Sequence, residues 1–304
     1  MSVVDDKIEI TGHAPIQTWF GVGGGADLYA KPASIDVLRR CLAEHETVRV
    51  LGDGANLLVD DGGVDGLVVD LDTAAFRSVE VDAASGRVVA GAGANLPNLV
   101  NQTVRAGLAG LEVLAGIPAS VGGAVVMNAG GKFGEIADSV RAVDGLDREG
   151  EQVRLPRDEI DFGYRRSGLN DLVVTSVEFA LEPGDPGTVR DRLKECMAYK
   201  KHTQPLAADS AGCCFKNPTL ADDLPDIGAG GSRVSAGLLI DRAGCKGLRV
   251  GGAEVSGEHA NFIVTHDGAC ARDVITLMDL IAARVADRFG VALGREVVVW
   301  ERSR

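Results

Sequence analysis

The sequence predicts an α+β protein built from two or three domains. The chain has 304 residues, of which 45% are hydrophobic and 25% charged, and this length and composition allow more than one buried core. Segments with the helical spacing of apolar residues alternate with short runs of β-branched residues that are typical of strands. The 40 glycines gather in clusters between these segments.

Four segments carry helix signals. Ser34 is a suitable N-cap for the first, Asn95 for the second, and Gly290 stops the last. Apolar residues of the last helix repeat at helical spacing, which indicates a core-facing stripe. The predicted helices cover residues 35–45, a segment that begins after Asn95 with Pro97 in its first turn, and residues 185–205 and 271–289. The predicted strands cover residues 47–51, 66–71, 87–90, 139–145, 152–156 and 296–300.

Charge and hydropathy limit the classes of partner. The formal net charge is −13, which argues against binding to nucleic acid but leaves room for a small anionic ligand held by a few arginines and backbone N–H groups. No apolar run is long enough to span a bilayer. Residues 1–13 carry acidic side chains where a signal peptide is basic and then apolar. We therefore expect a cytoplasmic protein that does not bind membranes.

The six cysteines show no metal-binding spacing. None lies in a C-x-x-C pair, and the five histidines are scattered, so no metal site is predicted. Free thiols in a reducing compartment fit best, and four of the cysteines read as small buried hydrophobic residues. These four are Cys41, Cys196, Cys245 and Cys270. The adjacent pair, Cys213 and Cys214, is too close in sequence for an ordinary disulfide.

Three glycine clusters are candidates for ligand binding. The sequence G-x-G-A-N-L follows a predicted strand twice, at residues 52–57 and 91–96, and neither copy has the G-x-G-x-x-G order of a dinucleotide fingerprint. Such turns either expose backbone N–H groups to phosphate or are ordinary tight turns. The third cluster, residues 114–131, is small and apolar, which suggests backbone packed against a flat ligand or against phosphate, or a glycine-rich crossover in the core.

Six motifs in order resemble one family. They are "IPASVGGAVVMNAGG", "FGYRRS", "SAGCCFKNP", "GLLIDRAGCKG", "GGAEVSGEHANFIV" and "LGREVVVW". Together they resemble UDP-N-acetylenolpyruvoylglucosamine reductase, a flavoenzyme of peptidoglycan synthesis, from about Thr18 to Trp300. The short connection after Ser167 is similar to that of the compact type II members.

The resemblance implies an architecture and a set of ligands. It implies an FAD-binding domain of the vanillyl-alcohol-oxidase type in two lobes, residues 1–75 and 76–203, followed by a smaller α+β substrate-binding domain, residues 204–304. It also implies FAD as cofactor, NADPH as co-substrate and UDP-N-acetylglucosamine enolpyruvate as substrate. We expect the protein to be a monomer. The family's FAD contacts carry over onto Gly52, Gly54, Ala55, Asn56, Leu57, Gly116, Ile117, Pro118, Ser120, Val121, Gly122, Gly123 and Asn128.

The resemblance also implies the catalytic residues. In the family's reaction, hydride goes from flavin N5 to C3 of the enol ether and a proton goes to C2. Arg165 matches the arginine that stabilises the developing negative charge, with Arg166 as its neighbouring rival, and Glu296 matches a glutamate expected to act in protonated form. Tyr164, Lys201 and Asn217 match the residues that bind the UDP part, although Lys200 lies beside Lys201.

The chain departs from the family pattern at the proton donor. Cys213 stands where the family usually has serine, and Cys214 occupies the variable position that follows. A thiol, with a reference pKa of about 8.5, is closer to working pH than a hydroxyl and suits the role of an acid. The alternatives are a sugar or alcohol oxidase of the same fold, and a flavin-binding protein in which this change marks lost catalysis.

Overall fold

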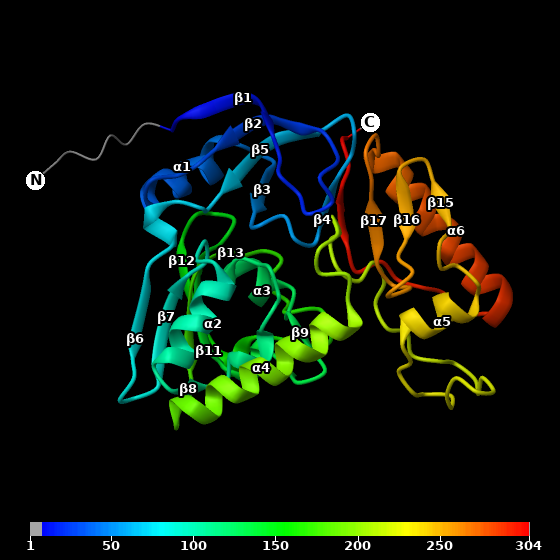
Figure 1. Cartoon of the computed structure of the whole chain (residues 1–304). Coiled ribbons are helices and arrows are strands. Elements are labelled where there is room, and N and C mark those ends of the chain that lie inside the picture. The colour runs from blue at the N-terminus through cyan, green and yellow to red at the C-terminus, as the bar shows by residue number, and fades with distance from the viewer. Residues whose placement is uncertain (1–7, 304) are drawn as a thin grey trace, which may run out of the picture. The chain divides into compact units, whose positions relative to one another are not determined.

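The computed structural model describes residues 8–303 as two compact units, which we describe separately (Figure 1). Unit 1 contains the described residues up to Ala14, with Ala26–Asp53 and Asp65–Lys200. Unit 2 contains Pro15–Gly25, Gly54–Val64 and the chain from Lys201 onward. Both predicted N-terminal lobes contribute to unit 1, and the division of the chain at residues 75 and 203 stays a prediction. Residues 1–7, used to argue against a signal peptide, lie outside the described part.

A four-stranded sheet forms the first layer of unit 1. Its strand order is β1-β2-β5-β3, and β3 pairs with β5 in parallel. Helix α1 follows β2; the Ser34 side chain caps it by accepting a hydrogen bond from Val37 N, and its buried face carries Leu38 and Cys41. The elements are β1 (Ile10–Pro15), β2 (Gly25–Ala30), α1 (Ile35–Glu44), β3 (Val48–Leu51) and β5 (Val64–Asp70).

A five-stranded antiparallel sheet forms the second layer of unit 1. Its order is β12-β11-β13-β7-β6, and α3 packs against β7 and β13 (Figure 1). The main elements are β6 (Val79–Asp82), β7 (Arg87–Gly91), α2 (Leu96–Arg105), α3 (Val121–Val126), β11 (Val140–Leu146), β12 (Gln152–Pro156), β13 (Val173–Ala180) and α4 (Pro186–Thr203). Shorter pieces are η1 (Ala74–Phe76), β8 (Leu108–Ala109), η2 (Glu112–Leu114), β9 (Gly130–Gly131), β10 (Gly134–Glu135), η3 (Ile136–Asp138), η4 (Arg157–Glu159) and β14 (Glu182–Pro183).

One hydrophobic core joins the two sheets of unit 1. Leu38 of α1 and Leu67 of β5 belong to the same buried cluster as Val88 of β7, Leu99 of α2 and Phe179 of β13, and all five are fully buried. Because the burial of apolar area stabilises the folded state in proportion to that area, this shared core fixes the turns between the strands relative to one another.

Unit 2 is built around α6 and two small sheets. Helix α6 packs against β15 and β16 (Figure 1), and it ends at Gly290, whose φ of 67° is the left-handed conformation expected of a glycine C-cap. The predicted stripe is buried: Val274, Leu277, Met278, Ile281 and Val285. The elements are β4 (Leu57–Val59), α5 (Ala236–Arg242), β15 (Arg249–Val250), β16 (Ala253–Val255), β17 (Ile263–Thr265), α6 (Ala271–Phe289) and β18 (Val298–Trp300), with β18 parallel to β4.

The predicted helices and strands are present, with ends that shift by a few residues. Within residues 8–303, no helix combines the length and the hydropathy that crossing a bilayer would require. All six cysteines are free thiols. Cys41, Cys196 and Cys245 are buried as expected, whereas Cys270 is half-buried because it occupies the N-cap of α6.

Candidate active site

Hydrogen bonds join two of the glycine clusters in unit 1. Val121 N and Gly122 N donate to the carbonyl oxygens of Ala94 and Ala92, both at 2.8 Å, and Leu96 N donates to Ala119 O at 2.9 Å. The turn between β7 and α2 therefore lies directly against the start of α3. Both clusters lie next to the C-terminal end of β7, an inner strand of the second sheet.

The first glycine turn meets the same place through Gly52. A Cβ added at Gly52 would lie 2.5 Å from Ser120 Oγ and 4.0 Å from Gly123 Cα. Ser120 Oγ accepts a hydrogen bond from Gly123 N, and the main chain of Gly52 and Gly123 is exposed. Gly52 and residues 120–123 thus form a patch of bare backbone beside the Ser120 hydroxyl, which a side chain at Gly52 would fill.

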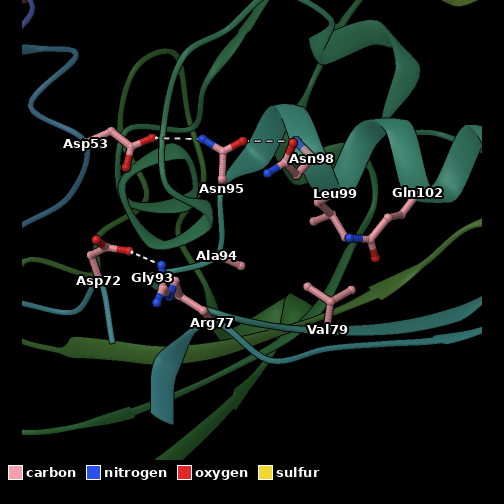
Figure 2. A pocket seen from close by; sticks show the side chains of 10 residues that line it. All are labelled: Asp53, Asp72, Arg77, Val79, Gly93, Ala94, Asn95, Asn98, Leu99 and Gln102. Atoms are coloured by element: carbon pink, nitrogen blue, oxygen red, sulfur yellow. Dashed lines mark hydrogen bonds and ion pairs between the residues drawn. The ribbon is translucent and has the colours of Figure 1, made fainter. Parts of the chain in front are cut away.

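A cavity of about 280 Å³ lies between the first turn and the N-terminus of α2 (Figure 2). Asn95 caps α2 by accepting from Asn98 N at 3.1 Å and donates to Asp53 Oδ2 at 3.4 Å. Burial, followed by the charge of Asp72, raises the pKa of Asp53. Asp72 forms an ion pair with Arg77 at 3.0 Å on the other side of the cavity (Figure 2). The cavity wall is therefore rich in carboxylates and amides.

Asn128 holds the turn that carries Tyr164 and Arg165. Its Nδ2 donates to Gly163 O at 3.0 Å, and its Oδ1 accepts from Ala137 N at 3.3 Å, so the buried amide joins two segments. Gly163 and Arg166 exchange two backbone hydrogen bonds, of 3.0 and 3.1 Å, which place Tyr164 and Arg165 at the corner of a tight turn.

Arg165 adopts a backbone conformation that is unusual for arginine. Its φ is 55°, and Asn128, which it contacts, has a φ of 45°. Left-handed backbone costs a non-glycine residue about 1–2 kcal/mol, and such strain gathers at functional sites. The guanidinium donates to Asn128 O at 3.4 Å and to Gly130 O at 2.9 Å. Arg166 instead points to the exposed Asp161, with which it pairs at 2.7 Å.

The two cysteines of unit 2 lie in an extended segment held from both sides. Cys214 N donates to Asn261 O at 2.8 Å on one side, and Glu296 N donates to Cys214 O at 2.8 Å on the other. Asn261 also brackets Phe215: its Oδ1 accepts from Phe215 N at 3.0 Å and its Nδ2 donates to Phe215 O at 2.8 Å. The backbone of Cys214 and Phe215, next to Cys213, is thereby fixed.

Successive side chains of an extended segment point to opposite faces, which separates the two thiols. Cys214 is fully buried in the core of unit 2, and this burial raises the pKa of its thiol to about 12. Cys213 is half-buried and forms a backbone bridge with Phe262. Of the two cysteines, Cys213 is the one that a ligand can reach.

Glu296 and Asn56 come from segments that lie side by side in unit 2. Asn56 Nδ2 donates to Glu296 O at 3.0 Å, and Val298 N donates to Asn56 O at 3.0 Å, where β18 begins to pair with β4. The half-buried Glu296 is therefore fixed by Cys214 and by Asn56 together.

The predicted substrate-binding residues differ in their surroundings. Asn217 accepts a hydrogen bond from Ala236 N at 2.9 Å through Oδ1, which ties it to the start of α5. Tyr164 is half-buried beside Arg165, whose guanidinium carbon lies 5.3 Å from the centre of its ring. Lys201 is exposed near the end of α4, whereas Lys200 is buried.

Comparisons with known proteins identify the family. The chain is 40% identical over 301 residues to the UDP-N-acetylenolpyruvoylglucosamine reductase of Moorella thermoacetica, an alignment that covers 97% of this chain and 94% of the relative.

The chain belongs to the UDP-N-acetylenolpyruvoylglucosamine reductase family.

Further matches agree with this assignment. The reductase of the same name from Heliobacterium modesticaldum is 43% identical over 288 residues, covering 93% of this chain and 87% of the relative. The solved structure of the reductase from Thermus caldophilus superposes with a TM-score of 0.78 at 39% identity, covering 97% of this chain and 99% of that one. The FAD binding domain family matches residues 27–156, and the reductase C-terminal domain family matches residues 204–300.

As a member of the reductase family, the protein is an FAD-dependent oxidoreductase of peptidoglycan synthesis. The predicted α+β fold class, an FAD-binding domain followed by a C-terminal domain of the reductase, is confirmed. The residues present fit FAD. The bare backbone at Gly52 and Gly123, beside the Ser120 hydroxyl, allows the close approach that a diphosphate needs, and the half-buried Ile117 and Pro118 offer an apolar seat for a ring.

Each unit gathers part of the predicted site. Unit 1 brings together Gly52, the segment 116–123, Asn128, Tyr164 and Arg165, and unit 2 brings together Asn56, Cys213 and Glu296 with their neighbours. The sequence did not settle the roles of Asn261 and His259. Asn261 is the bracket of the cysteine segment, and His259 Nδ1 accepts from Asn261 N at 3.2 Å, which makes His259 a structural partner. An "HAN" motif alone does not distinguish these roles from contact with a ligand.

Proposed function

We propose that this reductase converts UDP-N-acetylglucosamine enolpyruvate to UDP-N-acetylmuramate with NADPH as the electron donor. The names of the curated relatives and the motif set of this chain support that substrate. When bound, FAD would supply the hydride chemistry that links NADPH to C3 of the enolpyruvyl group. The residues of the chain bind the substrate, stabilise the negative charge that develops, and deliver a proton to C2.

Arg165 binds the substrate carboxylate in this proposal. A guanidinium stays charged at any working pH and grips a carboxylate with two parallel hydrogen bonds. The strained turn, held by Asn128, supports Arg165 over Arg166, because Arg166 is already paired with Asp161 at the surface. The fixed guanidinium stabilises charge without a reorganisation cost at the moment of reaction.

Cys213 donates the proton to C2, and Glu296 in its protonated form stabilises the carboxylate side of the intermediate. Only a neutral thiol can donate. A cation beside the thiol would favour the thiolate, and the charge of an anionic substrate would offset that effect. Tyr164, Lys201 and Asn217 bind the UDP part. FAD is held by the residues named for it from Gly52 to Leu57, from Gly116 to Gly123, and at Asn128.

The observation that carries the proposal is the difference between the two thiols. Cys213 is reachable, whereas Cys214 lies in the core with a pKa raised to about 12. The Asn261 bracket fixes this orientation. This difference supports Cys213, which replaces the family's serine, as the acid.

Three variants test the assignment in the FAD-loaded enzyme. Cys213→Ser should keep substantial turnover, because a hydroxyl fills the same role. Cys213→Ala should still accept electrons from NADPH but reduce the enolpyruvyl sugar nucleotide at least about a hundredfold more slowly. Cys214→Ala should turn over normally. Equal loss in both alanine variants would overturn the role of Cys213, and rapid oxygen consumption with simple sugars would favour an oxidase instead.

A further inference from the structure

A buried lysine of unit 1 has no partner for its charge. Lys200, in the last turn of α4, is 8% exposed. Within the part of the chain that the structure describes, its ammonium group makes no hydrogen bond and no ion pair. The exposed Lys194 of the same helix, by contrast, is paired with Asp191 at 2.8 Å.

Lys200 lies near a second cation, Arg165, and near Gly116, and both of these residues belong to the proposed site. The Cδ of Lys200 would lie 3.3 Å from a Cβ added at Gly116, the first residue of the predicted FAD segment, so its apolar stem packs on that glycine. Burial first, and then the like charge of Arg165, lower the pKa of Lys200 to about 8, while Cys196 acts in the opposite direction. Lys200 and Arg165 are therefore two cations in one region.

The carboxylate that acts on the neighbouring Cys196 is already paired with another cation. Glu112 is fully buried, and it pairs with Arg192 at 3.2 Å and accepts from Gly110 N at 2.6 Å. A buried charge without a counter-charge destabilises the folded protein, and buried polar groups that lack partners call for an explanation. The ordinary explanation is a lysine that interacts with the negative end of the helix dipole, which is worth at most about 2 kcal/mol.

We propose that Lys200, together with Arg165, binds an anionic oxygen of a nucleotide ligand held against the Gly116 segment. The inference rests on the proposed function and deepens it. The shared chemistry is a phosphate or carboxylate oxygen, and its two possible sources are the FAD and the UDP-sugar. A charge-assisted hydrogen bond from a desolvated ammonium suits either source.

Binding measurements on three lysine variants test this assignment. Lys200→Met keeps the apolar stem against Gly116 and removes the charge. Lys194→Met is the matched control on the exposed face of α4, and Lys201→Met tests the neighbouring lysine. Flavin fluorescence gives the Kd for FAD, and calorimetry on the FAD-loaded enzyme gives the Kd for UDP-N-acetylmuramate, which binds without turnover.

Lys200→Met should weaken one of the two ligands about ten- to a hundredfold, whereas Lys194→Met leaves both unchanged. A weaker Kd for FAD assigns the oxygen to the flavin nucleotide, and a weaker Kd for the UDP-sugar assigns it to the substrate. Lys200→Arg should restore much of the affinity. Both Kd values within twofold of wild type in Lys200→Met, or a loss confined to Lys201→Met, overturn the proposal.

The pH profile separates binding from a merely structural role. The groups around the ammonium are the guanidinium of Arg165 and the thiol of Cys196, whose pKa is raised by burial; Glu112 and Arg192 lie beside Cys196. The affinity of the wild type should fall as pH rises through about 8, and that dependence should disappear in Lys200→Met. If Cys213→Ala keeps full turnover, the proposed chemistry fails while the Lys200 binding result stands by itself.

Discussion

Replacing Asn261 should release the segment that presents Cys213. Asn261 is 3% exposed and makes two hydrogen bonds with the backbone of Phe215, at 3.0 and 2.8 Å. Asn261→Leu keeps the number and branching of the side-chain heavy atoms but removes both hydrogen-bonding groups. Because Phe215 is 1% exposed, its N–H and C=O groups would be left buried and unpaired.

The structure sets the size of the effect. A buried backbone group left without a partner costs about 1–3 kcal/mol, so the two groups of Phe215 should lower the free energy of unfolding by about 2–6 kcal/mol. Asn261→Asp keeps the acceptor for Phe215 N but turns an oxygen toward Phe215 O. It should therefore destabilise as well, and its cost should rise as the carboxyl ionises.

Urea unfolding and rapid kinetics measure the two consequences. Unfolding of Asn261→Leu should show the loss of stability, and Asn101→Leu, at an exposed position of α2, is the matched control. In single-turnover experiments, reduction by NADPH should proceed near the wild-type rate, whereas the step that uses the enolpyruvyl sugar nucleotide should slow at least tenfold. If Asn261→Leu has a free energy of unfolding within about 0.5 kcal/mol of wild type and normal kinetics, Asn261 does not fix the segment that presents Cys213.

Three further predictions concern unit 1. Without bound nucleotide, Lys200→Met should raise the free energy of unfolding at pH 7 by an amount on the order of 3 kcal/mol, because the pKa of Lys200 in the folded protein, about 8, lies below its unfolded value. This gain in stability should shrink as pH rises from 8 to 10.5. Urea unfolding at pH 7 and at pH 10 measures it. The buried Glu178 is 5% exposed and pairs with Arg154 at 2.8 Å and with Arg87 at 3.2 Å. Burial alone would raise the pKa of Glu178, but these hydrogen bonds lower it. Its contribution to stability is therefore present above the unfolded pKa of about 4.3 and is lost as pH falls through the folded value. Glu178→Gln should lose about 1–3 kcal/mol at neutral pH and almost nothing near pH 2, and equal losses at both would contradict the ion-pair explanation. Asn128→Ala removes the hydrogen bond to Gly163 O and should release the strained Arg165 turn, which raises KM for the sugar nucleotide at least about tenfold. An unchanged KM would show that Asn128 does not position Arg165 for the substrate.

Local sequence patterns predicted the helices and strands, but they could not distinguish the roles of the two turns that share one sequence. Both turns read G-x-G-A-N-L, yet Asn56 leads into β4 whereas Asn95 caps α2. Pro97 favours a helix start after the second copy. The different role of Asn56 depends on Glu296, which lies 240 residues further along the chain, and on β18, which follows it.

Neighbouring residues of the same type were the hardest to assign from sequence. Cys213 and Cys214 differ in exposure because Asn261 and Glu296, both distant in sequence, hold the extended segment that carries the two cysteines from either side. Arg165 and Arg166 differ because of a turn that Asn128 holds. Motif position selected one member of each pair, whereas the physical reason lies in long-range contacts that no local pattern contains.

NADPH oxidation by the purified protein tests the central claim most directly. We expect steady oxidation only when UDP-N-acetylglucosamine enolpyruvate is present, with one NADPH consumed for each UDP-N-acetylmuramate formed. Oxidation at the same rate without the sugar nucleotide, or a reduced flavin that the sugar nucleotide fails to reoxidise, would contradict it.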